Sequence, residues 1–382
     1  MRIALWHDLP PGGARRYLVE TTARLALAHD VTLVTTRTGD DDADLLEHVA
    51  AVHRVPGSPP ARGRVARLLA VRRDQQQLAT GIDAVGFDVA LVHGSQITQA
   101  PPLLSSLRTT PSLYVAQEPR RRTYERGYQP WLDPGGRVVR AARRTARRPF
   151  ELVLARWDRA AVHAATGLVV NSEFMREAMG AAYGRTGVVV HPGVDFGRFT
   201  VGTGPRTGVL SVGALDPTKG HDLVVDAIAR LDVEARPTFT VVFERMDPVY
   251  RDELRRRATT LGVDLRLRQG IDDKELADAY GEARVLVAAS VREPFGLTPL
   301  EAGAAGTFVI AIDEGGFRET VQPGINGVLV SRRVDALAAA LARELERPVA
   351  DPWSLRDALL PYWTWDRAVV ELDRTLSHTA AR

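Results

Sequence analysis

Short runs of aliphatic and β-branched residues alternate with longer amphipathic stretches along the whole chain, and this alternation predicts the fold class. The run over residues 2–7 precedes an amphipathic stretch over 14–28, which favours a strand followed by a helix. Because the runs are apolar throughout, they indicate parallel strands covered by helices on both faces of a sheet. In the first part of the chain the expected strands are 2–7, 31–36, 88–93, 112–117 and 167–172.

The same pattern restarts after the stretch over residues 188–199. The stretch over residues 201–208 is rich in Gly and Thr and separates the two sets of strands. The expected strands of the second set are 207–213, 239–244, 264–269, 285–290 and 308–313. The sequence therefore predicts an α/β protein with two doubly wound Rossmann-like domains that face each other across a cleft, with ligands at the carboxyl ends of the strands. We place the domains at residues 1–195 and 196–360, and expect a final helix within 361–382 to pack back on the first domain.

Length and composition narrow the class of protein. A chain of 382 residues is longer than one ordinary core, which agrees with two domains. There is no cysteine, so disulfides, thiolate catalysis and cysteine-based zinc sites are excluded. No apolar run reaches the length of a membrane span, and the N-terminus favours a strand and turn over a signal peptide. We expect a cytoplasmic protein that contacts, at most, the inner face of a membrane.

Two features of the first domain suggest ligand contacts. Gly12 and Gly13 lie between a strand and a helix, where glycine lets backbone N–H groups approach a phosphate. A tight turn explains them equally well, and no third glycine completes a dinucleotide fingerprint. His93 ends the strand 88–93, where it either positions a sugar hydroxyl or is satisfied by neighbouring backbone.

Lys219 stands just before a predicted helix in the second domain. A lysine near the positive end of a helix favours a bound anion more than it favours the helix itself. The alternative is a lysine solvated on a loop.

The stretch "REPFGLTPLEAGAAG", residues 292–306, carries two glutamates around a turn. Thr298, Pro299 and Glu301 fit the N-cap, N1 and N3 positions of a capping box, so Glu301 either caps its helix or accepts hydrogen bonds from two ribose hydroxyls. Glu293 precedes the turn and cannot cap it, so it is either functional or a solvated loop carboxylate. The free N–H groups near Gly296 would suit a diphosphate.

These residues resemble a known family. "EPFGLTPLEAGAAG", followed by "IDEGGFRETVQPGINGVLV", is similar to the donor-site signature of the retaining glycosyltransferases of family 4, which have the GT-B fold. The upstream stretches agree in order and spacing, and the match is dense over residues 167–330. These stretches are "GGARRYL", "VVNSEFMREAM", "VVVHPGVDFGRF", "VGALDPTKG" and "QGIDDKELADAYGEARVLVAAS".

The resemblance implies a role for each candidate residue. The residues that would bind the donor are Gly13, Gly296, Leu297, Thr298 and Glu301, and those that would act at the sugar or its leaving group are Glu293, His93 and Lys219. Glu301 would bind the ribose of a nucleoside diphosphate sugar, and Glu293 would help stabilise the transition state. Lys219 would be the counter-charge of the diphosphate, which departs as an anion.

The resemblance also implies the reaction. A sugar would pass from the nucleoside diphosphate to an acceptor hydroxyl with retention of configuration, and no metal or other cofactor is expected. The acidic run over residues 40–44 is interpreted as a solvated charge run and not as a metal site. Three alternatives stay open: a non-catalytic subunit that binds a sugar nucleotide, a GT-B sugar-nucleotide epimerase, and a scaffold recruited to membranes.

The chain departs from the family at position 214, where Ala214 replaces an arginine that would contact the diphosphate. We expect that another arginine substitutes, with Arg245 as the candidate, that donor binding is weaker, or that the protein is inactive. The retention of Lys219, Glu293 and Glu301 argues against inactivity.

Arginines are dense over residues 137–165. They favour a solvated helix face, an anionic acceptor or an anionic membrane surface. Nucleic acid is not an expected partner, because no nucleic-acid-binding module is present.

Overall fold

A computed structural model describes residues 1–37, 42–59, 61–124 and 137–382. The chain divides into two compact units. The first unit comprises Met1–His191 and Asp366–Arg382, and the second comprises Pro192–Trp365.

The first unit contains a parallel seven-stranded sheet. Its strands are β1 (Arg2–Asp8), β2 (Asp30–Thr35), β3 (Ala51–Arg54), β4 (Val89–Ser95), β5 (Ser112–Ala116), β6 (Gly167–Val170) and β7 (Val188–Val189). They are ordered β3-β2-β1-β4-β5-β6-β7. The chain therefore winds outward from β1 in both directions, which is the doubly wound arrangement expected from the apolar runs. The sequence analysis did not predict β3 and β7, because both are short and lie at the two edges of the sheet.

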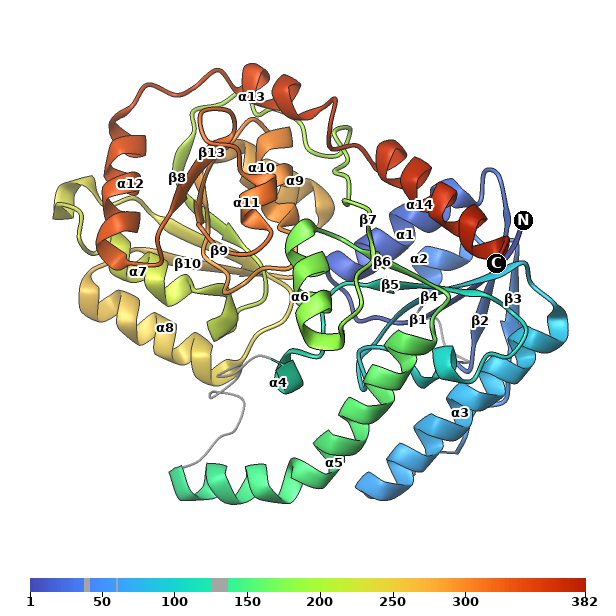
Figure 1. The fold of residues 1–382 in the computed structure, drawn as a ribbon. Helices are drawn as coiled ribbons and strands as arrows, with labels where there is room; N and C mark the ends of the chain where they lie inside the picture. Colours follow the sequence, from blue (N-terminus) through green and yellow to red (C-terminus); the bar gives the residue numbers. More distant parts are fainter. Residues whose placement is uncertain (38–41, 60, 125–136) are drawn as a thin grey trace. The chain divides into compact units, whose positions relative to one another are not determined.

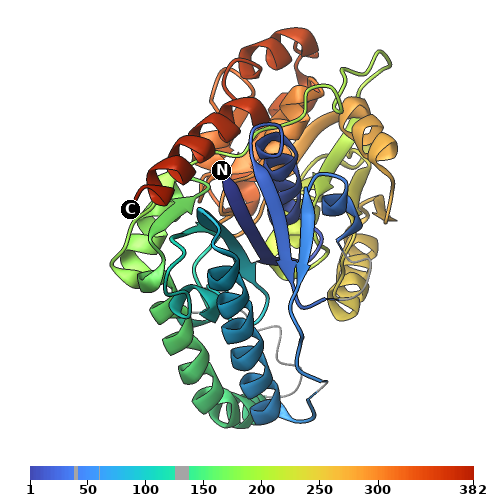
Figure 2. The same cartoon turned by 90° about the vertical axis from the view of Figure 1, so that its right-hand side faces the viewer.

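Helices cover both faces of this sheet. They are α1 (Gly13–Leu25), α2 (Ala43–Leu46), α3 (Arg64–Val85), α4 (Arg121–Tyr124), α5 (Arg137–Ala164), α6 (Glu173–Tyr183), α14 (Trp365–Ala380) and the 3₁₀ turn η1 (Pro102–Ser105). One face forms a core with α3, η1, α5 and α6. The helices α3 and α5 lie side by side in Figures 1 and 2.

The second unit contains a parallel six-stranded sheet. Its strands are β8 (Thr207–Val212), β9 (Phe239–Phe243), β10 (Leu265–Gln269), β11 (Ala283–Ala288), β12 (Phe308–Ile312) and β13 (Gly327–Val330). They are ordered β10-β9-β8-β11-β12-β13. The expected strands are confirmed within two residues at each end, and β13 is an additional edge strand.

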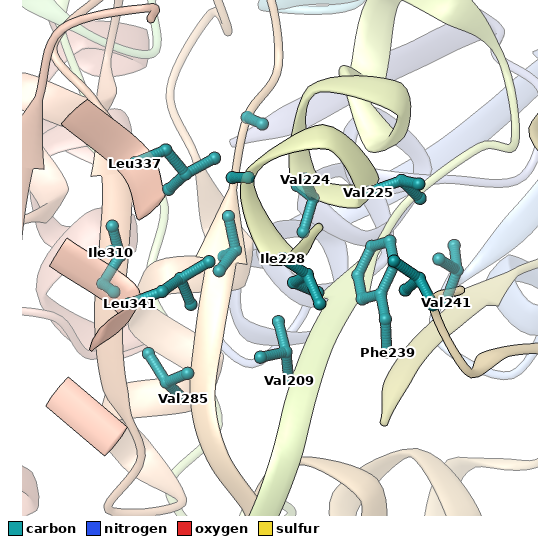
Figure 3. Close-up of a cluster of buried hydrophobic side chains, with 14 of the residues drawn as sticks. Val209, Val224, Val225, Ile228, Phe239, Val241, Val285, Ile310, Leu337 and Leu341 are labelled. Carbon is teal, nitrogen blue, oxygen red and sulfur yellow. The ribbon is translucent and has the colours of Figure 1, made fainter. Parts of the chain in front are cut away.

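The second sheet also has helices on both faces. They are α7 (His221–Ile228), α8 (Pro248–Leu261), α9 (Asp273–Glu282), α10 (Leu297–Ala304), α11 (Phe317–Thr320), α12 (Val334–Glu346), α13 (Pro352–Leu359) and the 3₁₀ turns η2 (Pro217–Lys219) and η3 (Val233–Ala235). On one face α7, α8 and α12 bury an aliphatic cluster against β8, β9, β11 and β12, including Ile228 and Leu341 (Figure 3). On the other face α9, α10 and α11 bury a second cluster that includes Phe295 and Leu300.

The C-terminal helix α14 packs within the first unit. Asp373 lies 2.7 Å from the Nε2 of His29, and Asp366 lies 2.7 Å from the Nε of Arg24 on α1. The units divide at Pro192 and Asp366, a few residues away from the expected boundaries at 196 and 361. Among the described residues, no helix combines the length and the apolar character that crossing a membrane requires.

Candidate active site

The loop after β11, residues 289–296, carries the first of the two glutamates. Glu293 accepts a hydrogen bond from the Nζ of Lys219 at 2.8 Å, and both side chains are about three-quarters buried, at 22% and 27% exposed. Glu293 is therefore not a solvated loop carboxylate, and Lys219 is not a solvated lysine. The two side chains come from loops that follow adjacent strands, β8 and β11, because the carboxyl ends of parallel neighbours meet at one edge of the sheet.

Local backbone brings Lys219 to this position. Asp216 caps the turn η2 by accepting from the N–H of Thr218 at 2.8 Å. The aliphatic part of Lys219 crosses Gly213, where a Cβ would lie 3.4 Å from it. Gly220 follows in the left-handed region at φ 67°, and a Cβ there would lie 2.4 Å from the carbonyl oxygen of Ala289. Only glycine lets the two loops approach this closely.

The helix α10 begins two residues earlier than the capping-box prediction requires. Its N-cap is Gly296, in the left-handed region at φ 100°, with no side-chain cap. Leu297 and Thr298 therefore occupy N1 and N2, and Thr298 is not the N-cap. The expected capping box is wrong, because a β-carbon at position 296 would collide with Phe317 and only glycine fits the turn. The N–H groups of this first turn have no acceptor within the helix, as at any helix start.

Glu301 lies in the second turn of α10 and does not cap it. It is 4% exposed, and its Oε2 accepts a hydrogen bond from the hydroxyl of Tyr280 at 2.6 Å. Tyr280 ends α9, is fully buried, and meets the ring of Phe199 edge-on at 5.5 Å. The carboxylate is thus held by a hydroxyl from a neighbouring helix.

Gly315 and Gly316 pack directly against the backbone of the 289–296 loop. The N–H of Gly316 donates to the carbonyl oxygen of Glu293 at 2.8 Å. A Cβ at Gly315 would lie 2.5 Å from that same oxygen, and one at Gly316 would lie 2.4 Å from the Cα of Phe295. The Gly-Gly pair therefore brings two backbones into direct contact below Glu293.

Arg332, which follows β13, ties the start of this loop to Glu314. Its guanidinium makes two hydrogen bonds with Glu314, at 2.9 and 3.0 Å. It also donates to the carbonyl oxygens of Ala289 at 2.9 Å and Ser290 at 2.6 Å. The planar guanidinium, with N–H donors on three nitrogens, can reach all three groups at once, which a lysine ammonium could not.

The backbone around Ala214 is held by hydrogen bonds to described residues, whereas the side chain of the neighbouring Arg245 is not. His221 is buried, and its Nε2 lies 3.3 Å from the carbonyl oxygen of Ala214. Burial lowers the pKa of His221 to about 4, so it is neutral near pH 7. The N–H of Leu215 donates to the carbonyl oxygen of Arg245 at 2.8 Å, which places Arg245 beside Ala214. The exposed Arg245 side chain has no partner among the described residues.

In the first unit the glycine turn opens α1. Gly12 is the N-cap at φ 140°, where a side chain is strained, although a Cβ would meet nothing within 4 Å. Gly13 is exposed in the first turn of the helix. The turn therefore presents bare backbone at the carboxyl end of β1.

His93 lies two residues before the end of β4. It is fully buried, and neither ring nitrogen has a hydrogen-bond partner among the described residues. The interpretation of a histidine satisfied by neighbouring backbone is therefore wrong. Burial lowers the pKa of His93 to about 3, and its ring lies 6.2 Å from that of Tyr17 on α1. A buried polar ring without partners requires an explanation, and a bound ligand or water supplies one.

A charged network that the sequence analysis missed lies beside the glycine turn. His7 accepts from the N–H of Leu9 at Nδ1, which leaves Nε2 to donate to Asp42 at 3.1 Å. Arg15 of α1 pairs with Asp42 at 3.0 Å and also with Asp44. Burial lowers the pKa of His7; burial alone would raise the pKa of Asp42, but His7 and Arg15 lower it.

Residues 40 and 41 lie outside the described residues. The interpretation of residues 40–44 as a solvated charge run is wrong for the buried Asp42, whereas Asp44 is exposed although it pairs with Arg15. Their partner Arg15 stands distant in sequence, so no local pattern could reveal the pairing.

Comparison with known proteins identifies the family. The family model described as "Glycosyltransferase Family 4" matches residues 11–198, and the model described as "Glycosyl transferases group 1" matches residues 203–359. The chain belongs to the family 4 glycosyltransferases.

Curated relatives of this glycosyltransferase match over part of their length. The D-inositol 3-phosphate glycosyltransferase of Streptomyces bingchenggensis is 35% identical over 219 residues, which are 51% of this chain and 48% of the relative. That of Catenulispora acidiphila is 32% identical over 244 residues, 56% of this chain and 58% of the relative. The matched part thus spans about half the length of these curated relatives.

Solved structures show that the glycosyltransferase has the expected GT-B fold. Sucrose-phosphate synthase from Thermosynechococcus elongatus has a TM-score of 0.75 at 20% identity, over 100% of this chain and 99% of that one. Anabaena HepE in complex with UDP-glucose has a TM-score of 0.73 at 19% identity, over 99% of this chain and 100% of that one.

Within the second unit of the glycosyltransferase, the fold brings together Lys219 and Glu293, whereas Glu301 lies farther along α10 with Tyr280. Gly13 and His93 lie in the first unit. The sequence analysis missed Tyr280 and Arg332. The tyrosine lies within a quoted family stretch and the arginine just after one, but no spacing pattern connects either to its partner.

Proposed function

We propose that this family 4 glycosyltransferase transfers a sugar from a nucleoside diphosphate sugar to an acceptor hydroxyl, with retention of configuration. The ion pair between Lys219 and Glu293, at the carboxyl end of β11, carries this proposal. A cation and a carboxylate in contact match the two needs of the reaction, which are a diphosphate that gains negative charge and a sugar centre that gains positive charge.

The donor diphosphate is proposed to bind at the start of α10. The N–H groups of Gly296, Leu297 and Thr298 would donate to it, and the positive end of the helix dipole adds to their effect. Lys219 would exchange part of its contact with Glu293 for a phosphate oxygen. Glu301 would accept hydrogen bonds from the ribose while Tyr280 holds its carboxylate.

When the glycosidic bond breaks, the leaving phosphate oxygen takes the electron pair of that bond. Lys219 and the N–H groups of α10 are proposed to stabilise this charge without a metal, because they are already oriented before the donor arrives. Glu293 would stabilise the positive charge that develops on the sugar.

Two residues of the first unit are proposed to complete the site. Gly13 would offer backbone to the diphosphate or sugar, since the turn before it is open to approach. His93 would form a hydrogen bond between a ring nitrogen and a sugar hydroxyl. This hydrogen bond would offset the cost of burying a ring nitrogen that has no partner among the described residues.

Arg245 is proposed to supply the positive charge at the diphosphate that an arginine at position 214 would supply in the family. Its backbone is hydrogen-bonded next to Ala214, and its exposed side chain has no partner in the part of the chain that the structure describes. A long flexible side chain there would supply a second cation to the phosphate, in addition to Lys219. If Arg245 does not act in this way, the Ala214 substitution favours a subunit that binds the donor without transferring the sugar.

The chemistry of the substrates follows from the relatives only as a proposal. HepE was solved with UDP and with UDP-glucose, which supports a uridine diphosphate sugar as the first donor to test. The curated relatives carry the name D-inositol 3-phosphate glycosyltransferase, which supports a polyol or sugar hydroxyl as acceptor.

Peripheral binding to an anionic membrane is proposed for the paired helices α3 and α5. Val65 and Leu69 of α3 are 62% and 60% exposed, and Leu152 of α5 is 54% exposed. The arginines on these helices, or directly before α3 in the sequence, include Arg62, Arg64, Arg67, Arg72, Arg73, Arg147, Arg148 and Arg156. Exposed apolar side chains among arginines suit an interface that contains anionic lipid. Flotation with anionic vesicles, compared between wild type and a Val65→Ser/Leu69→Ser variant, tests it.

The decisive experiment compares sugar transfer and donor hydrolysis in wild type, Glu293→Ala and the control Glu253→Ala, whose side chain is exposed on α8. We expect loss in the first variant alone, and the wild-type rate should persist after chelation of divalent metals. Equal background rates in wild type and Glu293→Ala, with UDP still bound, would establish a non-catalytic subunit.

A further inference from the structure

A groove that no proposed step uses lies between the end of β3 and the helix α3 in the first unit. Its volume is about 520 Å³. Its strand side is formed by residues 53–56, and its helix side by Arg73, Gln76, Gln77, Thr80 and Gly81. This size is in the range of small-molecule sites, and the place is the carboxyl end of a parallel strand, where α/β sheets bind ligands.

The polar residues of the helix side share one face of α3. Arg73, Gln76 or Gln77, and Thr80 are spaced by three or four residues, so their side chains are stacked along the groove. On the strand side His53 and Arg54 stand next to each other. The groove therefore has hydrogen-bond donors on both walls.

The charge of the groove is not compensated. None of the described residues that line it is an aspartate or a glutamate. Within the described ranges, the side chains of His53, Arg54 and Arg73 have no hydrogen-bond or ion-pair partner. Several arginines elsewhere in the first unit are paired, such as Arg15 with Asp42 and Arg37 with Asp8. Two unpaired arginines on one concave surface concentrate positive potential there.

A glycine in the middle of α3 lets helix and strand approach at this point. A Cβ on Gly81 would lie 3.1 Å from Cγ2 of Val55 and 3.4 Å from Nε2 of His53. Glycine is less favourable than alanine inside a helix, so its presence here calls for a reason in packing or function. The close approach sets the His53 ring against the helix backbone, at the base of the groove.

We propose that this groove binds a phosphate group, either of a phosphorylated acceptor or of a lipid headgroup. Arg54 and Arg73 would bind the phosphate oxygens from the two walls, since guanidinium groups match phosphate geometry. His53 and the amides of Gln76 or Gln77 would donate to the remaining oxygens. The groove is larger than a phosphate, so part of the organic group would lie in it as well. This proposal deepens the proposed function on its acceptor side, but binding to the groove does not require sugar transfer.

The test measures binding to the full chain by calorimetry. The soluble probes are glycerol 3-phosphate and, as the uncharged match, glycerol. The lipid probes are vesicles of phosphatidylcholine with phosphatidic acid and vesicles of phosphatidylcholine alone. The variants are Arg54→Gln, Arg54→Gln/Arg73→Gln, and the control Arg108→Gln, which removes the same charge from an exposed position of the first unit outside the groove.

We expect a phosphorylated probe to bind and its uncharged match not to bind. The double variant should bind the phosphorylated probe more weakly by about tenfold or more, whereas Arg108→Gln should bind as wild type does. Glycerol 3-phosphate binding that depends on Arg54 assigns a soluble acceptor, and vesicle binding alone with that dependence assigns a headgroup. Absence of both, or equal losses in the double variant and in Arg108→Gln, overturns the proposal.

Failure of this proposal is separable from failure of the proposed function. The thermal shift that UDP causes reports on the second unit, and it should be the same in wild type and in the Arg54→Gln/Arg73→Gln variant. A retained UDP shift with no phosphate binding rejects the groove alone.

Discussion

Three pairs of polar side chains are in contact around the candidate site of the second unit, whereas two polar features of the first unit lack such partners among the described residues. In the second unit Lys219 meets Glu293, Tyr280 meets Glu301, and Arg332 meets Glu314. In the first unit, counting only partners from the part of the chain that the structure describes, His93 is buried with none, and neither arginine of the groove at β3 has one. Preorganised pairs hold catalytic groups in place before a ligand arrives, while unpaired groups obtain their partners from the ligand.

The largest effect should come from breaking the pair at the proposed leaving group. Lys219→Ala is expected to lower kcat/KM by about 10²–10³-fold, because one oriented donor to the developing charge is lost. The control is Lys274→Ala, which removes an exposed lysine that pairs within α9. Steady-state kinetics with a UDP-sugar panel measure both, and an unchanged UDP affinity in Lys219→Ala would remove its assigned role.

A smaller loss should follow from releasing the loop that carries Glu293. Arg332→Ala removes the hydrogen bonds to Glu314, Ala289 and Ser290, so we expect kcat to fall about tenfold with less change in KM. Arg332→Lys keeps the charge but not the fork, and should recover only part of kcat. A variant that melts lower but retains wild-type kcat would show that the contact serves stability only.

The contact between Tyr280 and Glu301 predicts a still smaller and more selective change. Tyr280→Phe removes one hydrogen bond to a buried carboxylate, which is worth about 1–3 kcal/mol in stability and binding together. UDP should bind several-fold more weakly, whereas its 2′,3′-dideoxy analogue should bind equally to both proteins. Equal losses for both nucleotides would mean that Glu301 does not contact the ribose.

Lowering the pH should destabilise the fold gradually, because each unit buries a neutral histidine. Burial lowers the pKa of His93 to about 3 and that of His221 to about 4, so below pH 6.5 the unfolded chain binds protons that the folded chain does not. Asp158 acts in the opposite direction in the first unit, since burial raises its pKa to about 6.

As the pH falls from 6 to 4, protonation linked to His221 should therefore lower the free energy of unfolding of the second unit by about 1.4 kcal/mol per pH unit. The variant His221→Asn should not show this dependence. The free energy of unfolding against pH, measured by denaturant titration in both proteins, checks this. Parallel slopes would contradict it.

The fold could be predicted from the sequence because its strands are continuous apolar runs whose period does not depend on distant residues. Edge strands such as β3 and β13 were missed because they are short and only partly buried. In the site, Lys219 and Glu293 were found from their family stretches. The capping prediction at Thr298 failed because Gly296 packs against Phe317, which no local pattern reveals.

The sequence by itself determined the α/β class, the family and the stretches that contain the candidate residues, because periodicity and spacing are local properties of the chain. The tertiary structure alone decided which side chains have partners. Glu293 contacts Lys219, Glu301 accepts a hydrogen bond from Tyr280, and Arg332 donates to the backbone of the loop that carries Glu293. Within the described residues, the ring of His93 and the arginines of the groove at β3 have no such partner. These contacts join residues far apart in sequence, and only the packing of strands and helices sets their distances.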